Sequence, residues 1–417
     1  MRRSVCIVSP GNLASSPRLL KEADALHGAG YDVTAVVCNY TEALRRFDDE
    51  IVADVPWKVI RARRPVGERV VSMAAGRLAR FILACGATVS PALAARANPG
   101  PVSTLRRAAF DVPADLYIAH YIPGLAAAAS VARHHGAMLG FDAEDFHSGE
   151  GTGGPAEDFR VRMIETVERA ILPSCAYVTA AAPLIAAVYA ERYGLAPTTV
   201  LNVFPLGMAA AVPQPAAAHG GPAHLRAYWF SQTIGLDRGL QAFLQAMSRA
   251  KSRITLDIRG GNRWGHGDRL MTLARELGIA DRVALLPVAP PEQMVALAAP
   301  YDIGLSLETG VSENRRLCLT NKIFTYLLAG IPVAMSDTPA QRALAPELGA
   351  AATVVSLSDP AGMADALDRL GGSPAALGEA RAVALRLGRE RYNWDIEKDF
   401  LLGAVDRAFA ERRRESA

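Results

Sequence analysis

The sequence has few of the residues that form disulfides or hold a metal. Its five cysteines are odd in number, scattered over 417 residues and never spaced as a CxxC pair. Its eight histidines show neither HxxxH nor HExxH spacing. Scattered cysteines are typical of free thiols in a reducing compartment, and they argue against a disulfide framework. We therefore expect no structural metal site.

Long apolar runs are also missing. No run of eighteen or more apolar residues occurs, so no segment is predicted to cross a membrane. The first ten residues, MRRSVCIVSP, contain two arginines, but their apolar stretch is too short for a signal peptide. The formal net charge of +3 is too small to indicate a nucleic-acid partner. We expect a cytoplasmic protein.

A chain of 417 residues is too long for a single hydrophobic core and predicts two or three domains. Residues 205–222, which end in AAAVPQPAAAHGGP, break the pattern found on either side and are predicted to be a linker. The predicted domains are residues 1–204 and 223–391. A terminal helix in residues 392–417 is expected to pack back on the N-terminal domain.

Short apolar segments alternate with amphipathic ones in both predicted domains. The short segments are predicted to be strands and the amphipathic ones crossover helices, so the strands are parallel. The pattern predicts an α/β fold with two doubly wound parallel sheets, whose ligands bind at the carboxyl ends of the strands. The predicted strands are residues 4–9, 32–38, 114–120 and 137–141 in the first domain, and 226–230, 254–258, 283–286, 302–307, 331–335 and 353–355 in the second.

The second domain contains the stretch LTNKIFTYLLAGIPVAMSD, residues 319–337. Thr320 is predicted to cap a short helix that Gly330 ends, with Asn321 and Lys322 in the first turn. A lysine there adds positive charge to the positive end of the helix dipole, which is unfavourable unless an anion binds at the same place. The alternative is a solvated lysine whose stem packs on the surface.

Several polar residues follow predicted strands of the first domain. Gly11 lies in the loop after the first strand and permits close backbone approach to a ligand. His120 ends a strand, and Asp142 and Glu144 follow the next one, so all are expected at the carboxyl edge of one sheet. Arg18, in the first turn of the first helix, faces either a ligand at this edge or solvent. A metal-binding acidic cluster is another interpretation, but clustered acids in a loop are too common to favour it.

Residues 58–107 are strongly basic, with ten lysines and arginines and the single acid Glu68. Within them, residues 68–97 have the pattern of an amphipathic helix with apolar residues against arginines. Such a segment either lies in an anionic membrane interface or packs on the core with its arginines in solvent. Both interpretations stay open. The first would place the protein peripherally on the inner face of the cell membrane.

The plan of two Rossmann-like domains, a linker midway and a terminal helix resembles that of GT-B glycosyltransferases. Several motifs are similar to those of the retaining branch known as family 4, and together they span nearly the whole chain. Their order and spacing carry the resemblance more than any single motif does. The motifs are PGNLASSPRLLKEADALHGAGYDVTAVV, DLYIAHYIPGLAAAASVARHHGAMLGFDAEDFH, IGLDRGLQAF, LTNKIFTYLLAGIPVAMSD and YNWDIEKDFL.

The resemblance implies roles for individual residues. Arg238 stands where the family places a cation against the donor diphosphate, and Asn321 and Lys322 would face the same group. His120 matches the histidine near the transferred sugar, and His120, Arg238 and Lys322 are the candidates for catalysis. The residues assigned to the donor are Gly11, Asn12, Arg238, Glu313, Thr320, Asn321, Lys322 and Thr325, and those assigned to the acceptor side are Arg18, Asp142 and Glu144.

The sequence departs from the family pattern in several places. The family's usual pair of glutamates aligns with Leu317 and Thr325, and a threonine cannot bind the donor ribose as a carboxylate does. Thr233 stands in place of a second cation of the diphosphate site. On the acceptor side, Tyr121 replaces an aspartate and Glu144 a histidine. Nucleotide recognition must therefore differ in detail. The candidates to replace the missing carboxylate are Glu308, Glu313 and Asn314.

The resemblance implies a glycosyltransferase that moves a sugar from a nucleotide-diphosphate donor to a glycan, a lipid-linked molecule or a small molecule. It implies retention of configuration, with neither a metal nor a cofactor apart from the donor. The basic segment favours an anionic or lipid-linked acceptor. One alternative is a non-catalytic homologue that acts as a partner subunit, as Thr325 and Thr233 would favour. The other is a GT-B sugar-nucleotide epimerase or inverting transferase with Asp142 or Glu144 as its base.

Overall fold

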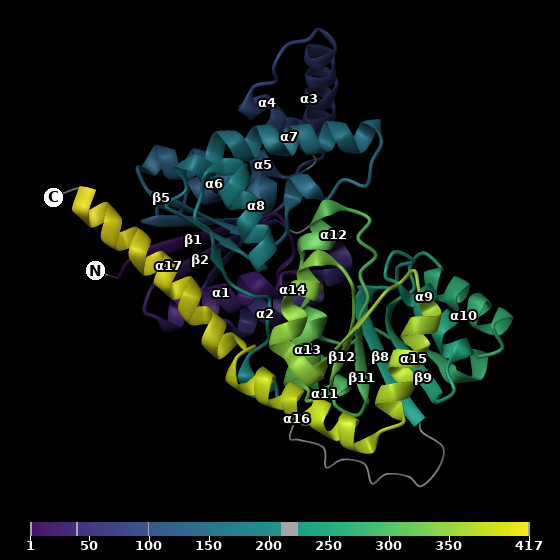
Figure 1. Cartoon of the computed structure of the whole chain (residues 1–417). Helices are drawn as coiled ribbons and strands as arrows, with labels where there is room; N and C mark the ends of the chain where they lie inside the picture. Colours follow the sequence, from purple (N-terminus) through teal and green to yellow (C-terminus); the bar gives the residue numbers. More distant parts are fainter. Residues whose placement is uncertain (1, 39–40, 99, 210–223, 416–417) are drawn as a thin grey trace. The chain divides into compact units, whose positions relative to one another are not determined.

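The computed structural model describes residues 2–38, 41–98, 100–209 and 224–415 (Figure 1). The chain separates into two compact units. Unit 1 consists of Met1–Val200, Ser312–Asn314 and Lys398–Ala417, and unit 2 consists of Leu201–Val311 and Arg315–Glu397. Most of the predicted linker, residues 210–222, lies outside the described residues.

Unit 1 is built on a seven-stranded parallel sheet in the order β3-β2-β1-β4-β5-β6-β7. β1 pairs with both β2 and β4, so the strand order reverses beside it. Every residue of β1 after Ser4 is buried, as expected for a central parallel strand covered on both faces. The strands are β1 (Ser4–Ser9), β2 (Asp32–Cys38), β3 (Lys58–Ala62), β4 (Leu116–His120), β5 (Met138–Ala143), β6 (Tyr177–Ala180) and β7 (Thr198–Thr199).

Helices connect these strands and cover the sheet. α6 packs so closely on β1 that a Cβ at Gly124 would lie 2.6 Å from the Val8 carbonyl oxygen. The helices that precede β7 are α1 (Pro17–Gly28), α2 (Arg45–Asp54), α3 (Val66–Ala84), α4 (Pro91–Ala97), α5 (Val102–Phe110), α6 (Tyr121–His135), α7 (Pro155–Ile171) and α8 (Pro183–Tyr193).

Residues 68–97, predicted as one helical segment, form parts of two helices. Gly86 follows α3 at φ 74°, a left-handed conformation that favours glycine and ends the helix. α4 begins after Ser90, whose side chain accepts a hydrogen bond from the Leu93 N–H. The prediction of one continuous segment was wrong because a glycine stop signal and a Ser-Pro start signal interrupt the apolar pattern.

Unit 2 contains a six-stranded parallel sheet in the order β10-β9-β8-β11-β12-β13. β8 lies between β9 and β11, so the order again reverses beside the first strand. Its core includes the buried side chains of Leu225, Trp229, Phe243, Ile258 and Leu305. The strands are β8 (His224–Thr233), β9 (Arg253–Gly261), β10 (Val283–Leu286), β11 (Ile303–Ser306), β12 (Val333–Ser336) and β13 (Ala352–Val355).

The helices of the second half of the chain follow the same alternation. They are α9 (Leu240–Arg249), α10 (His266–Glu276), α11 (Met294–Ala298), α12 (Glu313–Leu317), α13 (Asn321–Leu328), α14 (Pro339–Leu348), α15 (Pro360–Gly371), α16 (Pro374–Glu390) and α17 (Trp394–Glu415). The prediction of two doubly wound parallel sheets is confirmed.

α13 is the helix predicted to begin after Thr320. The Thr320 backbone is extended, with φ −74° and ψ 146°, as an N-cap residue requires. Its side chain, however, does not cap the helix and pairs instead with Ser306 Oγ at 2.9 Å. Gly330, at φ 71°, follows the helix in the left-handed conformation that was expected there.

From Lys398 onward, α17 groups with unit 1. Within that unit the Tyr31 hydroxyl donates a hydrogen bond to Asp406 at 2.8 Å, and the Tyr31 ring stacks on Phe409. Among the residues that the structure describes, no helix combines the length and the apolar character needed to cross a bilayer.

Gly124→Ala should destabilise unit 1, because the added methyl group would collide with the Val8 carbonyl. Over-packing of this kind costs about 1–3 kcal/mol. The matched control is Gly76→Ala in α3, where nothing lies within 4 Å of the added methyl group. There, replacing a helical glycine should stabilise by up to about 1 kcal/mol. Urea titrations followed by circular dichroism should move the two variants in opposite directions, and equal stabilities would contradict the close packing of α6 on β1.

Candidate functional site

A buried carboxylate in unit 2 is surrounded by three cations. Glu308 Oε2 lies 2.8 Å from Arg315 Nη1 and 3.6 Å from Arg238 Nη1, and Glu308 Oε1 lies 3.6 Å from Lys322 Nζ. We call these four residues the Glu308 cluster. Asp237 adds a half-exposed carboxylate 3.6 Å from Arg238 Nε. With every group ionised, positive charge exceeds negative charge in this region.

Loops at one edge of the unit 2 sheet bring the cluster together. Arg238 follows β8, Glu308 follows β11, and Lys322 lies in the first turn of α13. Because β8 and β11 are neighbours, the cluster lies where the strand order reverses. The Glu308 N–H donates to Ser336 Oγ at 2.8 Å, which ties the β11 loop to the end of β12.

Lys322 is buried, so its interpretation as a solvated lysine is wrong. The residue is 6% exposed, and its ammonium lies 5.9 Å from the centre of the Trp229 ring. Burial lowers the pKa of Lys322, the Glu308 carboxylate opposes that shift, and Arg238 and Arg315 add to it. A bound anion would offset the repulsion among these cations.

The cluster leaves polar atoms without hydrogen bonds. Among the described residues, Glu308 Oε1 and Arg238 Nε are buried and have no hydrogen-bond partner. Such atoms are uncommon in folded proteins, and they can mark a place where an ion or a ligand binds. The unmet hydrogen bonds therefore favour a binding role for the cluster.

A cavity of about 740 Å³ opens beside the cluster. Residues after β11, β12 and β13 line it, among them Thr309, Asp337, Thr338 and Ser356, and it shares Glu308 with the cluster. Within the described part of the chain, the buried Thr338 hydroxyl makes no hydrogen bond. Ligand pockets measure about 300–1,000 Å³, so a nucleoside or a sugar can fit here.

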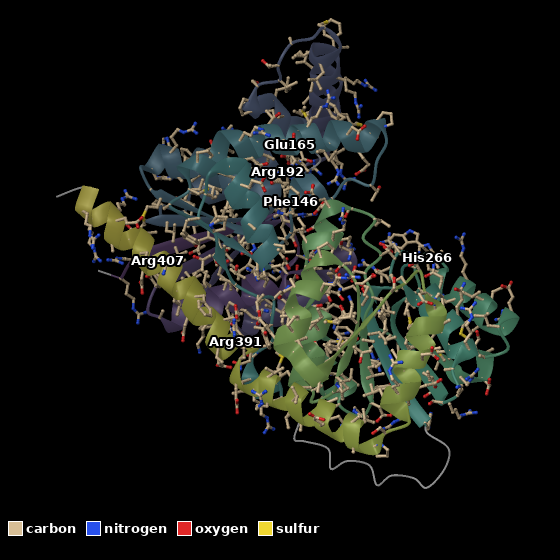
Figure 2. All side chains as sticks on the ribbon, in the orientation of Figure 1. Phe146, Glu165, Arg192, His266, Arg391 and Arg407 are labelled. Atoms are coloured by element: carbon tan, nitrogen blue, oxygen red, sulfur yellow. The ribbon has the colours of Figure 1, made fainter. Side chains whose placement is uncertain are left out.

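Glu313, one of the residues predicted to bind the donor, has its ion-pair partner in unit 1. Glu313 groups with unit 1, where its carboxylate pairs with Arg192 at 3.0 Å. Arg192 also lies over the ring of Phe146 and contacts Glu165 at 3.4 Å (Figure 2). Glu313 is therefore a partner of Arg192 in α8.

The other two proposed substitutes differ in their surroundings. The Asn314 amide oxygen accepts from the Phe146 N–H at 2.9 Å, and its nitrogen donates to Asp145 at 2.8 Å. Glu308 is the candidate that faces the cations. Thr325 Oγ1 donates to the Asn321 carbonyl one turn earlier, at 2.9 Å. The Thr325 hydroxyl is thus used within α13.

In unit 1, Arg18 and Asp142 form a buried ion pair at the carboxyl edge of the sheet. Arg18 Nε and Nη2 donate to the two Asp142 oxygens at 2.6 and 2.7 Å, and Nη1 donates to the Val200 carbonyl at 2.8 Å. Thr179 Oγ1 also donates to Asp142, at 2.6 Å. Burial alone would raise the pKa of Asp142, but Arg18 holds it at about 2. Arg18 is therefore not solvated.

His120 is buried between two carboxylates. Its Nε2 lies 2.5 Å from Glu22 Oε2, and its Nδ1 lies 3.5 Å from Asp142 Oδ2. Burial lowers the pKa of His120, but Glu22 and Asp142 reverse that shift and raise it above its ordinary value. The imidazole is thus held in place from both sides.

Sequence reasoning missed Lys21 and Glu22, which are buried beside this network. Burial and the neighbouring Arg18 lower the pKa of Lys21 to about 7, against the pull of Glu144 and Asp142. A signal existed in the sequence. Residues 18, 21 and 22 are spaced i, i+3 and i+4, which places them on one face of α1.

Tyr121 and Glu144, the two departures on the acceptor side, contact each other. The Tyr121 hydroxyl donates to Glu144 Oε2 at 3.1 Å. Among the described residues, Tyr121 is the one non-glycine residue with positive φ, at 57°. Backbone strain of this kind costs about 1–3 kcal/mol and is concentrated at functional sites. Burial, Asp145 and Asp142 raise the pKa of Glu144, although Arg18 opposes them.

The loop after β1 is held by a side-chain pair that includes Asn12. Asn12 Nδ2 donates to Asp48 at 2.7 Å, and Asn12 Oδ1 accepts from the Thr41 N–H at 3.0 Å. The Ala14 N–H donates to the other Asp48 oxygen at 2.9 Å. At Gly11 an added Cβ would lie 3.2 Å from Ser16 Oγ, so a larger residue would disturb this loop.

Among the described residues, no three His, Cys, Asp or Glu side chains come together in a way that could hold a metal ion. The acids Asp142 and Glu144 instead contact Arg18 and Tyr121.

Asp142→Asn should show how the contribution of the Arg18–Asp142 ion pair to the free energy of unfolding depends on pH. A carboxyl whose folded pKa is depressed stabilises the fold above its unfolded pKa of about 3.9, and that stability is lost as pH falls toward about 2. The stability difference between wild type and Asp142→Asn should therefore shrink by about 2–3 kcal/mol between pH 5 and pH 2. Urea titrations at several pH values measure it. A difference that does not change with pH would contradict the depressed pKa.

No protein-family model matches the chain, and no curated protein matches it. Solved structures do resemble it. Anabaena Alr3699/HepE, solved in complex with UDP, superposes with a TM-score of 0.69 at 13% identity, over 97% of this chain and 100% of that chain. Sucrose-phosphate synthase from Thermosynechococcus elongatus gives a TM-score of 0.72 at 13% identity, over 98% and 100%.

The lipopolysaccharide outer core galactosyltransferase WaaB, in its apo form, is also similar, with a TM-score of 0.64 at 12% identity over 96% of this chain and 99% of that one. These neighbours are GT-B glycosyltransferases. Identities this low establish the fold alone. This chain has the GT-B fold, and its two parallel sheets are the two Rossmann-like halves of that fold.

Proposed function

We propose that this protein is a glycosyltransferase that takes a sugar from a nucleotide-diphosphate donor bound at the Glu308 cluster. The observation that carries the proposal is the convergence of Arg238, Arg315 and Lys322 on one buried carboxylate. The cluster lies at the reversal point of the unit 2 sheet, where open α/β sheets bind ligands. A diphosphate is negatively charged and would neutralise the excess positive charge of these cations.

Glu308 would act as an internal anion that holds the cations before the donor binds. Without it, three neighbouring positive charges would repel one another in a buried site. Its contacts with Arg238 and Lys322 are 3.6 Å long, beyond the roughly 2.7–2.9 Å of a charge-assisted hydrogen bond. Both cations can therefore bind phosphate oxygens without losing a strong hydrogen bond to Glu308.

The same cations would stabilise the leaving diphosphate. As the bond between the sugar and the phosphate oxygen breaks, negative charge develops on that oxygen, and preorganised positive groups oppose it. The first N–H groups of α13 add to this field, because they have no partner within the helix. Neutralisation by protein groups supports a reaction without a metal.

We propose transfer with retention of configuration. The acceptor oxygen forms its bond to the anomeric carbon on the face from which the diphosphate leaves, and the departing phosphate oxygen takes the acceptor proton. No separate base is needed. His120 suits a positioning role, because both its ring nitrogens face carboxylates.

The nucleoside or sugar of the donor would enter the cavity beside the cluster. Thr325 cannot bind ribose hydroxyls as a glutamate does, and its hydroxyl is used within α13. Asp337 lines the cavity and supplies a carboxylate for that purpose. UDP is the first nucleotide to test, since the HepE structures contain UDP or UDP-glucose.

The acceptor would be a glycan or a lipid-linked molecule held at the carboxyl edge of the unit 1 sheet. Arg18 and Asp142 neutralise each other there in an ion pair, so their role is to hold the structure of this edge. Lys21 and Tyr121 are the better candidates for contact with a substrate. The pKa of Lys21 is near 7, and the backbone of Tyr121 is strained.

Two other functions make different demands on these residues. An epimerase or inverting transferase needs a base, and Asp142 is a weak one because Arg18 holds its pKa at about 2. Glu144, whose pKa is raised, remains as a candidate base. A non-catalytic partner subunit is favoured by the threonine at position 325, but it gives no reason for the buried Glu308 cluster.

A thermal-shift screen with UDP, GDP, ADP, dTDP and CDP should identify the donor nucleotide. A ligand at 100 times its Kd stabilises the fold by about 2.7 kcal/mol. Lys322→Ala should weaken that shift, whereas Lys251→Ala, an exposed lysine of the same unit, should not. If no nucleotide stabilises the wild type, with or without magnesium, the donor site is lost and the partner-subunit function is favoured.

Kinetics with the identified donor should separate transfer with retention from its rivals. Arg238→Gln should lower kcat by about 100- to 1,000-fold, because it removes one group that opposes the developing charge. Arg263→Gln, at an exposed arginine of the same unit, should leave kcat unchanged. Glu144→Gln should keep most of the activity. A comparable loss in Glu144→Gln with donor binding intact would identify Glu144 as a base and contradict the proposed mechanism.

A further inference from the structure

α3 exposes an unusual number of large apolar side chains. Of the fifteen such side chains that are exposed among the described residues, six lie on this one helix. The exposed fraction reaches 82% at Val66 and 66% at Phe81. Figure 1 shows α3 beside α4, on the side of α7 away from the unit 1 sheet. The six residues, which we call the α3 apolar face, are Val66, Val70, Val71, Met73, Leu78 and Phe81.

The opposite side of α3 faces the protein through small residues and one acid. Ala75 and Ala79 are buried, and α3 contacts α4. The Glu68 carboxylate accepts hydrogen bonds from the Ser103 N–H at 2.7 Å and from the Thr104 hydroxyl at 2.5 Å. These contacts fix the rotation of the helix, so the α3 apolar face is directed outward. The interpretation of α3 as a helix that packs its large apolar residues on the core is wrong.

Positive charge accompanies the α3 apolar face. Arg69 and Arg77 are exposed on the same helix, and Arg77 falls between Met73 and Phe81 in the helical spacing. Arg80 is less available because it lies over the Phe159 ring at 3.9 Å. The single acid of residues 58–107 is the buried Glu68, so no acid of this segment offsets the arginines at the surface.

The basic surface continues past the end of α3. A cavity of about 500 Å³ lies between the α3–α4 connection and α7. Leu83, Val89 and Met163 give it apolar walls. The exposed Arg162 and Arg169 also line it, against the single acid Glu165. Apolar surface and guanidinium groups therefore occur together here, as they do along α3.

We propose that the α3 apolar face docks on an anionic lipid bilayer. Its apolar side chains would enter the interface below the lipid phosphates, while Arg69 and Arg77 pair with those phosphates. A basic helix with large apolar residues on the inserted side binds membranes in this way, through apolar burial and attraction to anionic lipid. The charge disfavours a second copy as the occupant, since a symmetric contact would bring the arginines of two α3 helices together.

The proposal goes beyond glycosyl transfer, because it concerns where the protein resides and uses none of the residues assigned to the donor. It also does not depend on the acceptor being a lipid. An acceptor anchored in the same bilayer would meet the enzyme at high local concentration, but docking alone requires only the exposed face and its charge.

Flotation of the full-length protein with vesicles tests the proposal. One set of vesicles contains phosphatidylcholine alone, and the other contains phosphatidylcholine with phosphatidylglycerol. The wild type should float with the anionic set, only weakly with the neutral set, and less in high salt. Two basic residues contribute roughly 1 kcal/mol each, so Arg69→Gln/Arg77→Gln should weaken binding about 30-fold. Val70→Ser/Met73→Ser/Phe81→Ser should weaken it at least as much.

Matched controls test whether binding depends on the α3 apolar face or on any exposed apolar or charged side chain. Trp264→Ser/Val288→Ser removes two exposed apolar side chains of unit 2, and Arg413→Gln/Arg414→Gln removes two exposed charges of α17. Both controls should float like the wild type. Because every substituted side chain is exposed, melting temperatures should stay close to that of wild type. The nucleotide-induced thermal shift should also be unchanged in all four variants, which separates docking from donor binding.

Three outcomes would overturn the proposal. The first is a wild-type protein that does not float with anionic vesicles, and the second is that the α3 variants float as the wild type does. The third is a wild-type dimer in sedimentation experiments without lipid that the apolar triple variant dissociates, since the α3 apolar face would then be a protein interface.

Discussion

Charge buried at the carboxyl edges of two parallel sheets is the constraint on which the rest of this protein depends. Parallel strands send their loops to one edge, and there the chain buries Arg18 and Asp142 in unit 1 and Glu308 and Lys322 in unit 2. A buried ion remains charged only where opposite charges and hydrogen bonds replace its water. In unit 1 the ions meet that need with one another, as Arg18 and Asp142 do at 2.6 Å. In unit 2 three cations share one carboxylate, and this imbalance favours a ligand.

Much of this architecture could be predicted from the sequence, because strand, turn and helix signals are local. The apolar runs place the strands of the unit 2 sheet and those of the unit 1 sheet apart from β3, β6 and β7, and Gly330 marks the end of α13. The sequence also identified His120 and Asp142 near strand ends and Lys322 in the first turn of a helix. It could not pair them, since pairing depends on contacts such as Arg18 with Asp142, which are 124 residues apart. The identity of a residue does not tell whether an arginine is solvated or buried, since burial depends on the fold.

The proposed donor side differs from the family motif in the place of its carboxylates. With threonine at position 325, the hydroxyl returns to the α13 backbone and leaves no carboxylate on that helix turn. Glu308 reaches the cations from the β11 loop instead, and Asp337 lines the neighbouring cavity from the end of β12. Sequence spacing alone placed Glu313 on equal terms with Glu308. The structure separates them, because Glu313 pairs with Arg192 in unit 1. In the proposed donor site the carboxylates therefore come from other loops of the same sheet edge, which a fixed motif does not anticipate.

α3 illustrates why hydrophobic periodicity does not by itself tell which side of a helix faces the protein. The residues with the larger apolar side chains point outward, whereas Ala75 and Ala79 point inward. Small side chains allow close approach to neighbouring helices, so the alanine side packs well despite its low hydrophobic content. Glu68 completes that side because its carboxylate can accept the N–H groups at the start of α5. In most helices of water-soluble proteins the apolar residues are buried and the acids are exposed. α3 has a buried acid and an exposed apolar stripe instead. The reversal has a physical reason if the solvent on the outer side is a bilayer, in which the large apolar residues of α3 are as well buried as they would be in a core.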